Sequence, residues 1–267
     1  MKLILILLTL VLSSCSQLTV DYHVPTTGGY LPEASGAIFS GNIGGYLTST
    51  QKVVVGSAQS VRIFGSSADT TINASPKGGS SAVLGLGGRF GLTNFLELGL
   101  RKSGESTTVL NATLQFLGGS TKERTVGYKA SFSSGIGRGS QEESNFKLND
   151  TTTNSTQDNL AGELDLKSVD FGLQHGFRFN KYLMLYNSFF YTEFEMEGSI
   201  TATDGIKYNL VNTTTLKSVN LGILFTTSGL RAFQLQGEIG YSTSSVRGDA
   251  RGSRDQATLL VSPSFRF

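Results

Sequence analysis

The sequence predicts an all-β fold in which antiparallel strands close into an up-and-down barrel. Glycine contributes 33 of the 267 residues, and each glycine inside a helix costs roughly 1 kcal/mol relative to alanine. Apolar and polar residues alternate along much of the chain, which is the period of a strand with different surroundings on its two faces. Short and long connections alternate between these segments, so we expect hairpins with unlike ends.

The composition excludes several kinds of site. Cys15 is the single cysteine, which rules out a disulfide framework and a multi-cysteine zinc site. His23 and His175 are the two histidines, and 22 Lys+Arg oppose 20 Asp+Glu for a formal net charge of +2. A balance this even does not favour nucleic acid as a partner. We therefore predict no metal site, no cofactor and no nucleic-acid binding.

The first element is an N-terminal signal peptide over residues 1–14. Lys2 supplies a positive start, and residues 3–12 form an apolar run of ten residues. A run of this length is too short to cross a bilayer as a helix but suits the apolar part of a secretory signal.

The motif Leu12-Ser13-Ser14-Cys15 follows the apolar run and resembles the lipobox of bacterial lipoproteins. This resemblance implies cleavage before Cys15 and acylation of that residue, and several acyl chains would make membrane attachment stable. Ser16 in the next position resembles lipoproteins that are sorted to the outer membrane. The alternative is an ordinary signal peptide followed by an incidental thiol.

Residues 15–35 are expected to form a lipidated periplasmic tether, and residues 36–267 the barrel. The tether carries two of the four prolines and lacks sustained periodicity, which is typical of an irregular connection. A segment that enters the lumen of the barrel is the less favoured alternative.

Alternation by itself fits two all-β architectures. In the segment 96–101, LELGLR, leucines alternate with residues of another kind. A soluble sandwich would turn the apolar face inward. An outer-membrane barrel would turn it to lipid and line the lumen with the polar face.

The connections favour the membrane barrel, because outer-membrane barrels have long external loops and short periplasmic turns. Aromatic residues such as Phe90, Phe95, Phe116 and Phe179 gather beside the short connections, where an interfacial girdle is expected. Residues 102–105 are the one brief connection at the external end. The predicted short turns are residues 91–94, 118–124, 180–181 and 227–231, and the long loops are residues 49–79, 138–163, 196–214 and 244–255.

The last strand carries an assembly motif. Val261, Phe265 and Phe267 alternate with other residues down to a final phenylalanine. This pattern resembles the C-terminal signal by which the barrel-assembly machinery recognises outer-membrane proteins, although Pro263 interrupts it and removes one ladder hydrogen bond. Residues 89–101 resemble a hairpin common in transporter-like outer-membrane barrels. Together these resemblances imply a bacterial outer-membrane β-barrel of the transporter-like or porin-like kind.

The lipid thickness requires about 9–11 residues per tilted strand, which gives ten strands with both chain ends at the periplasmic rim. Residues 51–65 stay open, because they either extend the first loop or supply part of two more strands, for twelve in all. The ten predicted strands are residues 36–48, 80–90, 95–102, 106–117, 125–137, 164–179, 182–195, 215–226, 231–243 and 256–267.

The inward positions of these strands line the lumen, where any activity would lie. Buried charges need partners, so Arg89, Glu97 and Arg101 are expected to form a network near the first periplasmic turn. Inward glycines such as Gly172 and Gly222 leave two alternatives open, a narrow aqueous path or a lumen closed by the charge network. The charged lumen-lining positions are five cations and three acids, namely Arg89, Arg101, Lys129, Arg178, Arg266, Glu97, Asp170 and Glu238.

The predicted function is a narrow channel or transporter for small solutes, with a slight preference for anions. The alternative is a non-conducting structural or surface-interaction barrel that acts through its external loops, because strand period does not determine the width of the lumen. No catalysis is expected, since His23 falls in the tether, His175 falls on the lipid face, and the sequence contains no G-x-S-x-G, HExxH or P-loop spacing. The expected partners are outer-membrane lipid, the barrel-assembly machinery and, for a channel, small solutes.

Overall fold

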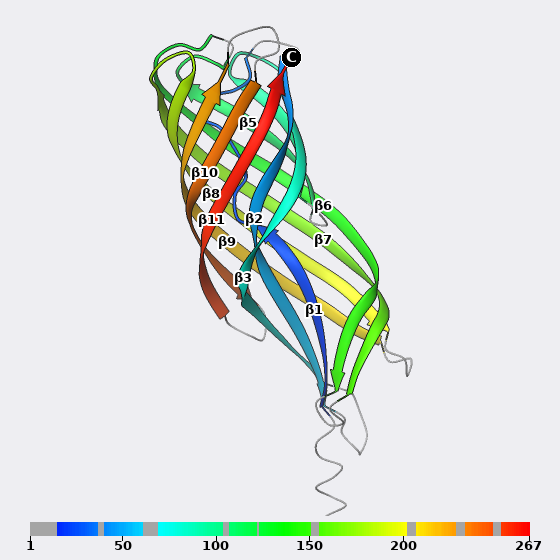
Figure 1. The fold of residues 1–267 in the computed structure, drawn as a ribbon. Coiled ribbons are helices and arrows are strands. Elements are labelled where there is room, and N and C mark those ends of the chain that lie inside the picture. Colours follow the sequence, from blue (N-terminus) through cyan, green and yellow to red (C-terminus); the bar gives the residue numbers. More distant parts are fainter. Residues whose placement is uncertain are drawn as a thin grey trace, which may run out of the picture.

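The structure, a computed structural model, describes residues 15–36, 40–60, 69–103, 107–121, 123–150, 155–201, 207–227, 233–247 and 252–267. In these ranges ten antiparallel strands form a closed barrel, and one further strand, β1 (Cys15–Pro25), pairs with the part that projects at one end (Figure 1). The predicted all-β fold and ten-stranded antiparallel barrel are confirmed. The same ranges contain no helix that is long and apolar enough to cross a membrane.

The barrel strands are, in chain order, β2 (Gly41–Ser60), β3 (Asp69–Gly91), β4 (Leu96–Ser103), β5 (Thr108–Leu117), β6 (Gly127–Asp150), β7 (Ser155–Arg178), β8 (Leu183–Thr201), β9 (Lys207–Thr226), β10 (Phe233–Arg247) and β11 (Gly252–Arg266). Each strand pairs with its neighbours in the chain, and β11 pairs with β2 to close the barrel. Residues 51–60 continue β2, so the twelve-stranded alternative is wrong, whereas residues 61–65 lie outside the described residues.

Several strands extend far beyond the length that a membrane requires. β6 and β7 each contain 24 residues, and their pairing continues to Asp150 opposite Ser155. The sequence predicted a polar loop over residues 138–163, and most of that stretch is instead the end of a hairpin. Polar residues do not prevent strand pairing, because the ladder is formed by backbone groups.

β1 lies along the projecting end of the barrel. It pairs with β2 from Cys15 opposite Ser60 to Pro25 opposite Thr50, and its first residues also pair with the end of β6. Phe267 pairs with Gly41 at the other end of β2. We call the end of the barrel where hairpins such as β6–β7 project the long-hairpin rim, and the opposite end the short-turn rim. Cys15 lies at the long-hairpin rim and Phe267 at the short-turn rim (Figure 1), so the expectation that both chain ends lie at one rim is wrong.

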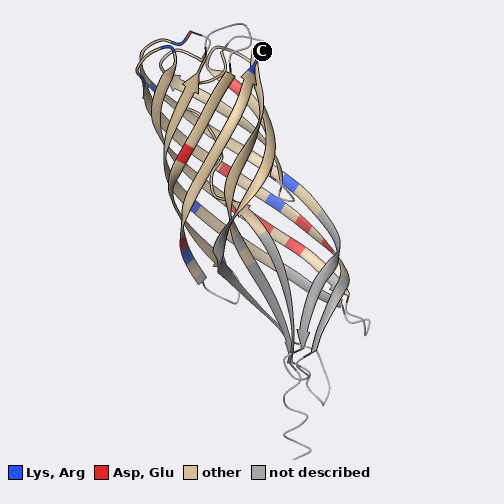
Figure 2. Cartoon of the chain, in the orientation of Figure 1, with Lys and Arg blue, Asp and Glu red and all other residues tan. Residues whose placement is uncertain are grey.

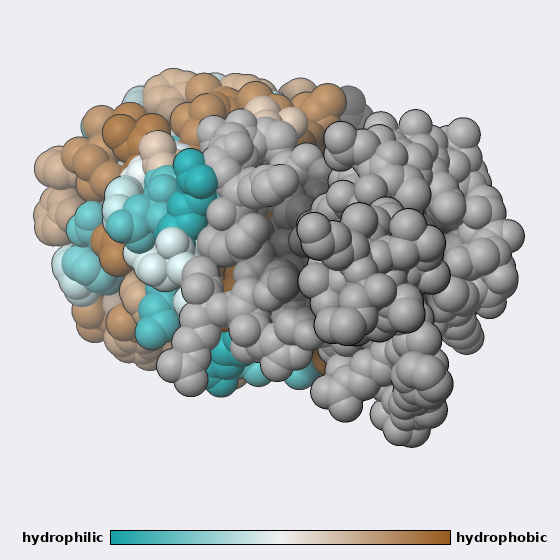
Figure 3. Space-filling view, turned by 90° about the horizontal axis from the view of Figure 1, so that it is seen from below, coloured by the Kyte–Doolittle hydropathy of each residue, from teal (hydrophilic) through white to brown (hydrophobic). Residues whose placement is uncertain are grey.

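The two faces of the barrel wall differ in polarity. On β7 the side chains of Val169, Phe171 and Leu173 are 42%, 40% and 47% exposed, whereas those of Asp170 and Gln174 are buried. The outward face is thus apolar and the inward face polar, the arrangement of a barrel in lipid and the inverse of a soluble sandwich. Hydrophobic residues follow much of the outline of the described part in Figure 3. Charged residues are sparse on the strands near the C-terminal end in Figure 2.

The segment after β1 runs through the inside of the barrel. Tyr30, Leu31 and Glu33 are 4%, 1% and 0% exposed, and the segment makes hydrogen bonds with wall residues along its length. The expectation of an irregular tether over residues 15–35 is therefore wrong, because residues 15–25 form β1 and the less favoured alternative of a segment in the lumen describes residues 26–35. A ten-stranded barrel is wider than one filled by its own side chains, so it can accept an extra segment. We call residues 26–35 the lumen segment.

Candidate functional site

The lumen segment and the wall around it form the candidate site. All eight charged residues that the sequence assigned to the lumen lie on the inner face of the described strands, either buried or partly exposed. The lumen segment adds a fourth acid, Glu33, that was not in the predicted set. The wall supplies Arg89, Glu97, Arg101, Lys129, Asp170, Arg178, Glu238 and Arg266.

Glu33 is the centre of a buried charged cluster. Its Oε1 accepts a hydrogen bond from Arg178 Nε at 2.6 Å, and its Oε2 accepts one from Arg178 Nη2 at 2.5 Å. Lys129 Nζ lies 3.7 Å from Oε1, and Thr121 Oγ1 donates to Oε2 at 3.3 Å. The side chains of Glu33 and Arg178 are fully buried, and two parallel hydrogen bonds give this pair a fixed geometry. The wall cations thus take their counter-charge from the lumen segment.

A second acid ties the lumen segment to the wall. Glu97 Oε2 accepts hydrogen bonds from the backbone nitrogen and the hydroxyl of Ser35, each at 2.8 Å. Its other oxygen, Oε1, lies 3.4 Å from Arg89 Nη1. Gln115 contributes nearby by accepting a hydrogen bond from the backbone nitrogen of Ala34 at 2.8 Å. The C-terminal end of the lumen segment is therefore held by two carboxylates, one its own and one of the wall.

Arg101 does not join Arg89 and Glu97, so the predicted three-residue network is wrong at this position. Its guanidinium instead forms an ion pair across the lumen with Asp170, whose other oxygen accepts a hydrogen bond from Thr192 at 2.6 Å. The guanidinium carbon also lies 5.0 Å from the ring centre of Tyr30, within the range of a cation–π contact. A partner on β7 was inaccessible to sequence reasoning, because residues 101 and 170 meet only when the barrel closes.

The other end of the lumen segment is held by Glu238 and Gln236, and Arg101 Nη1 donates to the backbone oxygen of Thr27 at 3.4 Å. Glu238 accepts hydrogen bonds from Thr27 Oγ1 at 2.5 Å and from Tyr186 Oη at 2.8 Å. Gln236 Nε2 donates to the backbone oxygen of Gly29 at 3.1 Å. A buried acid that lacks a cation partner here is satisfied by three neutral donors, since Gln236 also donates to it at 3.1 Å.

Two of the inward glycines, Gly172 and Gly222, make room for tyrosine rings and leave no aqueous path at their positions. A Cβ at Gly172 would lie 2.6 Å from the ring of Tyr30, and one at Gly222 would lie 2.1 Å from the ring of Tyr186. Both distances are shorter than atoms can approach, so these rings occupy the space that a side chain would need. The alternative of an aqueous path at these two glycines is wrong, because larger residues fill the space.

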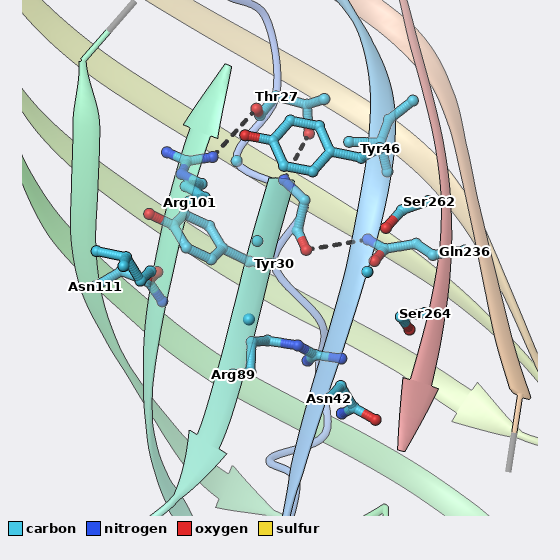
Figure 4. A pocket seen from close by; sticks show the side chains of 17 residues that line it. Thr27, Tyr30, Asn42, Tyr46, Arg89, Arg101, Asn111, Gln236, Ser262 and Ser264 are labelled. Carbon is cyan, nitrogen blue, oxygen red and sulfur yellow. Dashed lines mark hydrogen bonds between the residues drawn. The ribbon is translucent and has the colours of Figure 1, made fainter. Parts of the chain in front are cut away.

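A small cavity remains beside the lumen segment (Figure 4). Its volume is about 80 Å³, and Tyr30, Asn42, Arg89 and Arg101 are among the residues that line it. Figure 4 shows the Arg101 and Gln236 side chains hydrogen-bonded to the lumen segment at its edge. The size and the polar lining suit ordered water or a small polar solute.

The remaining predicted residues lie at the short-turn rim or on the outer face. Arg266 donates to the backbone oxygen of Thr121 at 3.2 Å. Val261, Phe265 and Phe267 point outward and are 39%, 59% and 61% exposed. His175 also points outward, with its ring 5.9 Å from that of Tyr128. Among the described residues no group of three or more His, Cys, Asp or Glu is placed to hold a metal ion.

Sequence reasoning missed Glu33, Tyr30 and Tyr186. One signal was present, because five inward cations against three inward acids left an excess of buried positive charge to be compensated. The two tyrosines gave no such signal, since only the closed barrel brings them against glycines on other strands.

No protein-family model matches the chain, and no curated protein matches it. Several solved structures resemble it distantly, among them the following three. The attachment invasion locus protein Ail of Yersinia pestis, in complex with a heparin analogue, is 14% identical over 86% of this chain and 100% of that chain, with a TM-score of 0.32. The outer membrane protease OmpT of Escherichia coli is 8% identical over 96% of this chain and 97% of that chain, with a TM-score of 0.37. The β domain of the Bordetella autotransporter BrkA is 12% identical over 86% of this chain and 99% of that chain, also with a TM-score of 0.37.

These likenesses are too distant to bear on activity. The architecture rests on the strand pairing and the two faces of the wall in this chain itself. A closed antiparallel barrel with an apolar outer face, a polar inner face, short turns at one rim and long hairpins at the other is the architecture of outer-membrane β-barrels.

Proposed function

We propose that the protein is a non-conducting outer-membrane barrel in its resting state, and that it acts through the hairpins projecting from one rim. The lumen segment is bound to the wall by charged and neutral contacts along its whole length, so the lumen is a packed interior. The projecting ends of β6 and β7, together with β1, then form the part of the molecule available to partners outside the membrane.

The observation that carries this proposal is the pair formed by Glu33 and Arg178. Both side chains are fully buried in the lumen and joined by two short hydrogen bonds. Withdrawing the lumen segment would break the Glu33–Arg178 pair and remove the nearby acid from Lys129, and breaking a buried pair costs about 3–5 kcal/mol. A resting barrel therefore keeps the segment in place.

Purified protein in planar bilayers tests the proposal. The native chain is expected to hold the current at baseline, because the lumen segment blocks the path. Glu33→Gln is expected to produce intermittent current steps, since the segment loses its strongest attachment. Glu197→Gln, which changes an exposed ion pair on the outer face, is the matched control and is expected to stay at baseline. Regular current steps from the native protein would refute the proposal.

A small-solute channel gated by the lumen segment is the second candidate function. The eight predicted inward positions, all in the described residues, supply five cations and three acids, so a lumen without Glu33 has an excess of positive charge there. This excess favours anions in a displaced state. The reversal potential of any Glu33→Gln current in a salt gradient distinguishes a gated channel from a damaged barrel. Anion preference supports gating, and an unselective current supports damage.

We also propose a bacterial outer-membrane location, with removal of residues 1–14 and lipid attachment at Cys15. Because Cys15 pairs with Ser60, a lipid on it would lie at the long-hairpin rim, opposite the short-turn rim that carries Phe267. Metabolic labelling with palmitate tests the anchor. Loss of label in Cys15→Ser is expected, and label retained by that variant would refute attachment at this residue.

The other proposals follow from the same architecture. Val261, Phe265 and Phe267 face outward on the last strand, where they are accessible to the barrel-assembly machinery during insertion. Truncating Phe267 is expected to lower the amount of folded barrel in the outer membrane. We propose no catalytic activity, and loss of a lipid-modifying activity in His175→Ala would overturn that.

A further inference from the structure

The strand pair that closes the barrel is less completely paired than its neighbours. β11 and β2 share five register positions, whereas β10 and β11 share fourteen. The interruption falls at Ser262 and Pro263, between Val261 opposite Leu47 and Ser264 opposite Gly44. Proline has no backbone N–H to donate, so the ladder is weakened at this point. We call this interrupted stretch the β11–β2 seam.

An apolar groove lies on the outer face over this seam. Its volume is about 670 Å³, and Leu84, Leu86, Val261 and Pro263 are among the residues that line it. Gly45 lies between them, and a Cβ there would meet only the backbone oxygen of Gly85 at 3.6 Å, which is ordinary contact. The groove therefore exists because position 45 has no side chain while its neighbours are large.

Among the described residues a single cation, Lys102, lines the groove. Lys102 is exposed and pairs in register with Leu86. None of the ion pairs formed within the described part of the chain includes Lys102. A lysine near the edge of an apolar band can place its ammonium at the level of lipid headgroups. The groove thus presents apolar walls with one positive charge at the register position of Leu86.

We propose that the groove binds one acyl chain of an anionic phospholipid, whose phosphate lies against Lys102, and that the bound chain covers the β11–β2 seam. This inference rests on the proposed membrane location. The chemistry of the groove matches the two parts of such a lipid, since its apolar walls suit the hydrocarbon and Lys102 suits the phosphate. At the seam the Gly45 backbone oxygen accepts a hydrogen bond from Ser262 Oγ at 3.2 Å, and a chain in the groove would pack over this contact.

Native mass spectrometry of the full chain in detergent, titrated with phosphatidylglycerol or phosphatidylcholine, tests the site. The native protein is expected to retain one phosphatidylglycerol more strongly than phosphatidylcholine. Gly45→Leu fills the groove without a backbone clash and is expected to remove this retention. Leucine has a higher strand propensity than glycine, so the substitution is not expected to disrupt the strand. Gly237→Leu places the same side chain at another outward position, where a Cβ has its nearest contact at 3.4 Å, and serves as the matched control.

Lys102 is tested separately. Lys102→Gln is expected to weaken phosphatidylglycerol binding about threefold, the loss typical of one exposed ion pair, and to leave phosphatidylcholine binding unchanged. Lys102→Arg is expected to restore the preference. Equal retention of both lipids by the native protein, or full retention by Gly45→Leu, would overturn the proposal. Bilayer current stays a separate readout, so a failed lipid test with baseline current refutes this site alone.

Discussion

Ion pairs and glycines occur on both faces of the barrel wall, and their surroundings differ. Inside, Glu33 and Arg178 form a pair with fully buried side chains, whereas outside Lys167 and Glu197 form a pair in which the side chains are 46% and 53% exposed. Inside, the space at Gly172 is taken by a tyrosine ring, whereas outside the space at Gly45 is open. The inner face is therefore a packed core of polar side chains. Substituting an ion pair or a glycine is expected to change the free energy of unfolding more on the inner face than on the outer face.

Removing the inner charge is expected to have the largest effect. Glu33→Gln leaves Arg178 buried without a counter-charge, so it should lower the free energy of unfolding by about 3–5 kcal/mol. Urea unfolding in lipid vesicles, followed by circular dichroism, measures the change. Glu197→Gln removes an exposed pair and is expected to cost less than about 1 kcal/mol. Similar losses for the two variants would contradict the difference between the faces.

Filling an inner glycine is expected to have an intermediate effect. Gly172→Ala forces a methyl group against Tyr30, and overpacking of this kind costs about 1–3 kcal/mol. In a Tyr30→Ala background the same substitution should cost less, because the ring is gone while the close contact with the Gln174 side chain remains. Unfolding of the four proteins in this cycle measures the coupling between the two positions. Gly237→Ala is the outer-face control, and a vanishing coupling would show that the ring lies elsewhere.

An outer-face carboxylate is expected to show the smallest effect. Hydrogen bonds from Tyr241 and Thr243 hold the pKa of Asp255 below its ordinary value of 3.8, and this residue lies before the predicted membrane stretch of β11. A lowered pKa in the folded state stabilises the fold above the ordinary value, and the gain is lost as the pH falls through the folded pKa. In Tyr241→Phe the pKa should rise toward 3.8. NMR titration of the Asp255 carboxyl carbon measures this, and an unchanged pKa would remove Tyr241 as the cause.

The sequence predicted much of the wall because period-two alternation is a local property. Each inward residue from Arg89 to Arg266 follows from counting positions along one strand, and His175 was placed on the outer face in the same way. Strand ends at the long-hairpin rim were misjudged, because polar residues near Asp150 look like a loop although their backbone still pairs. The irregular composition of residues 26–35 likewise resembled a tether. A segment that hydrogen-bonds to a polar lumen has the same kind of local sequence as a segment that hydrogen-bonds to water.

The sequence by itself determined the all-β class, the ten strands and the faces of the wall, because each depends on residues a few positions apart. The tertiary structure decided which acid compensates Arg178, which rim carries Cys15 and what fills the space at Gly172. Glu33 and Arg178 are 145 positions apart, and no period or spacing links them. Their contact exists only once the strands have closed into a barrel around the lumen segment. The contacts of the interior therefore depend on the tertiary structure, whereas the two faces of the wall follow from the local alternation of residues.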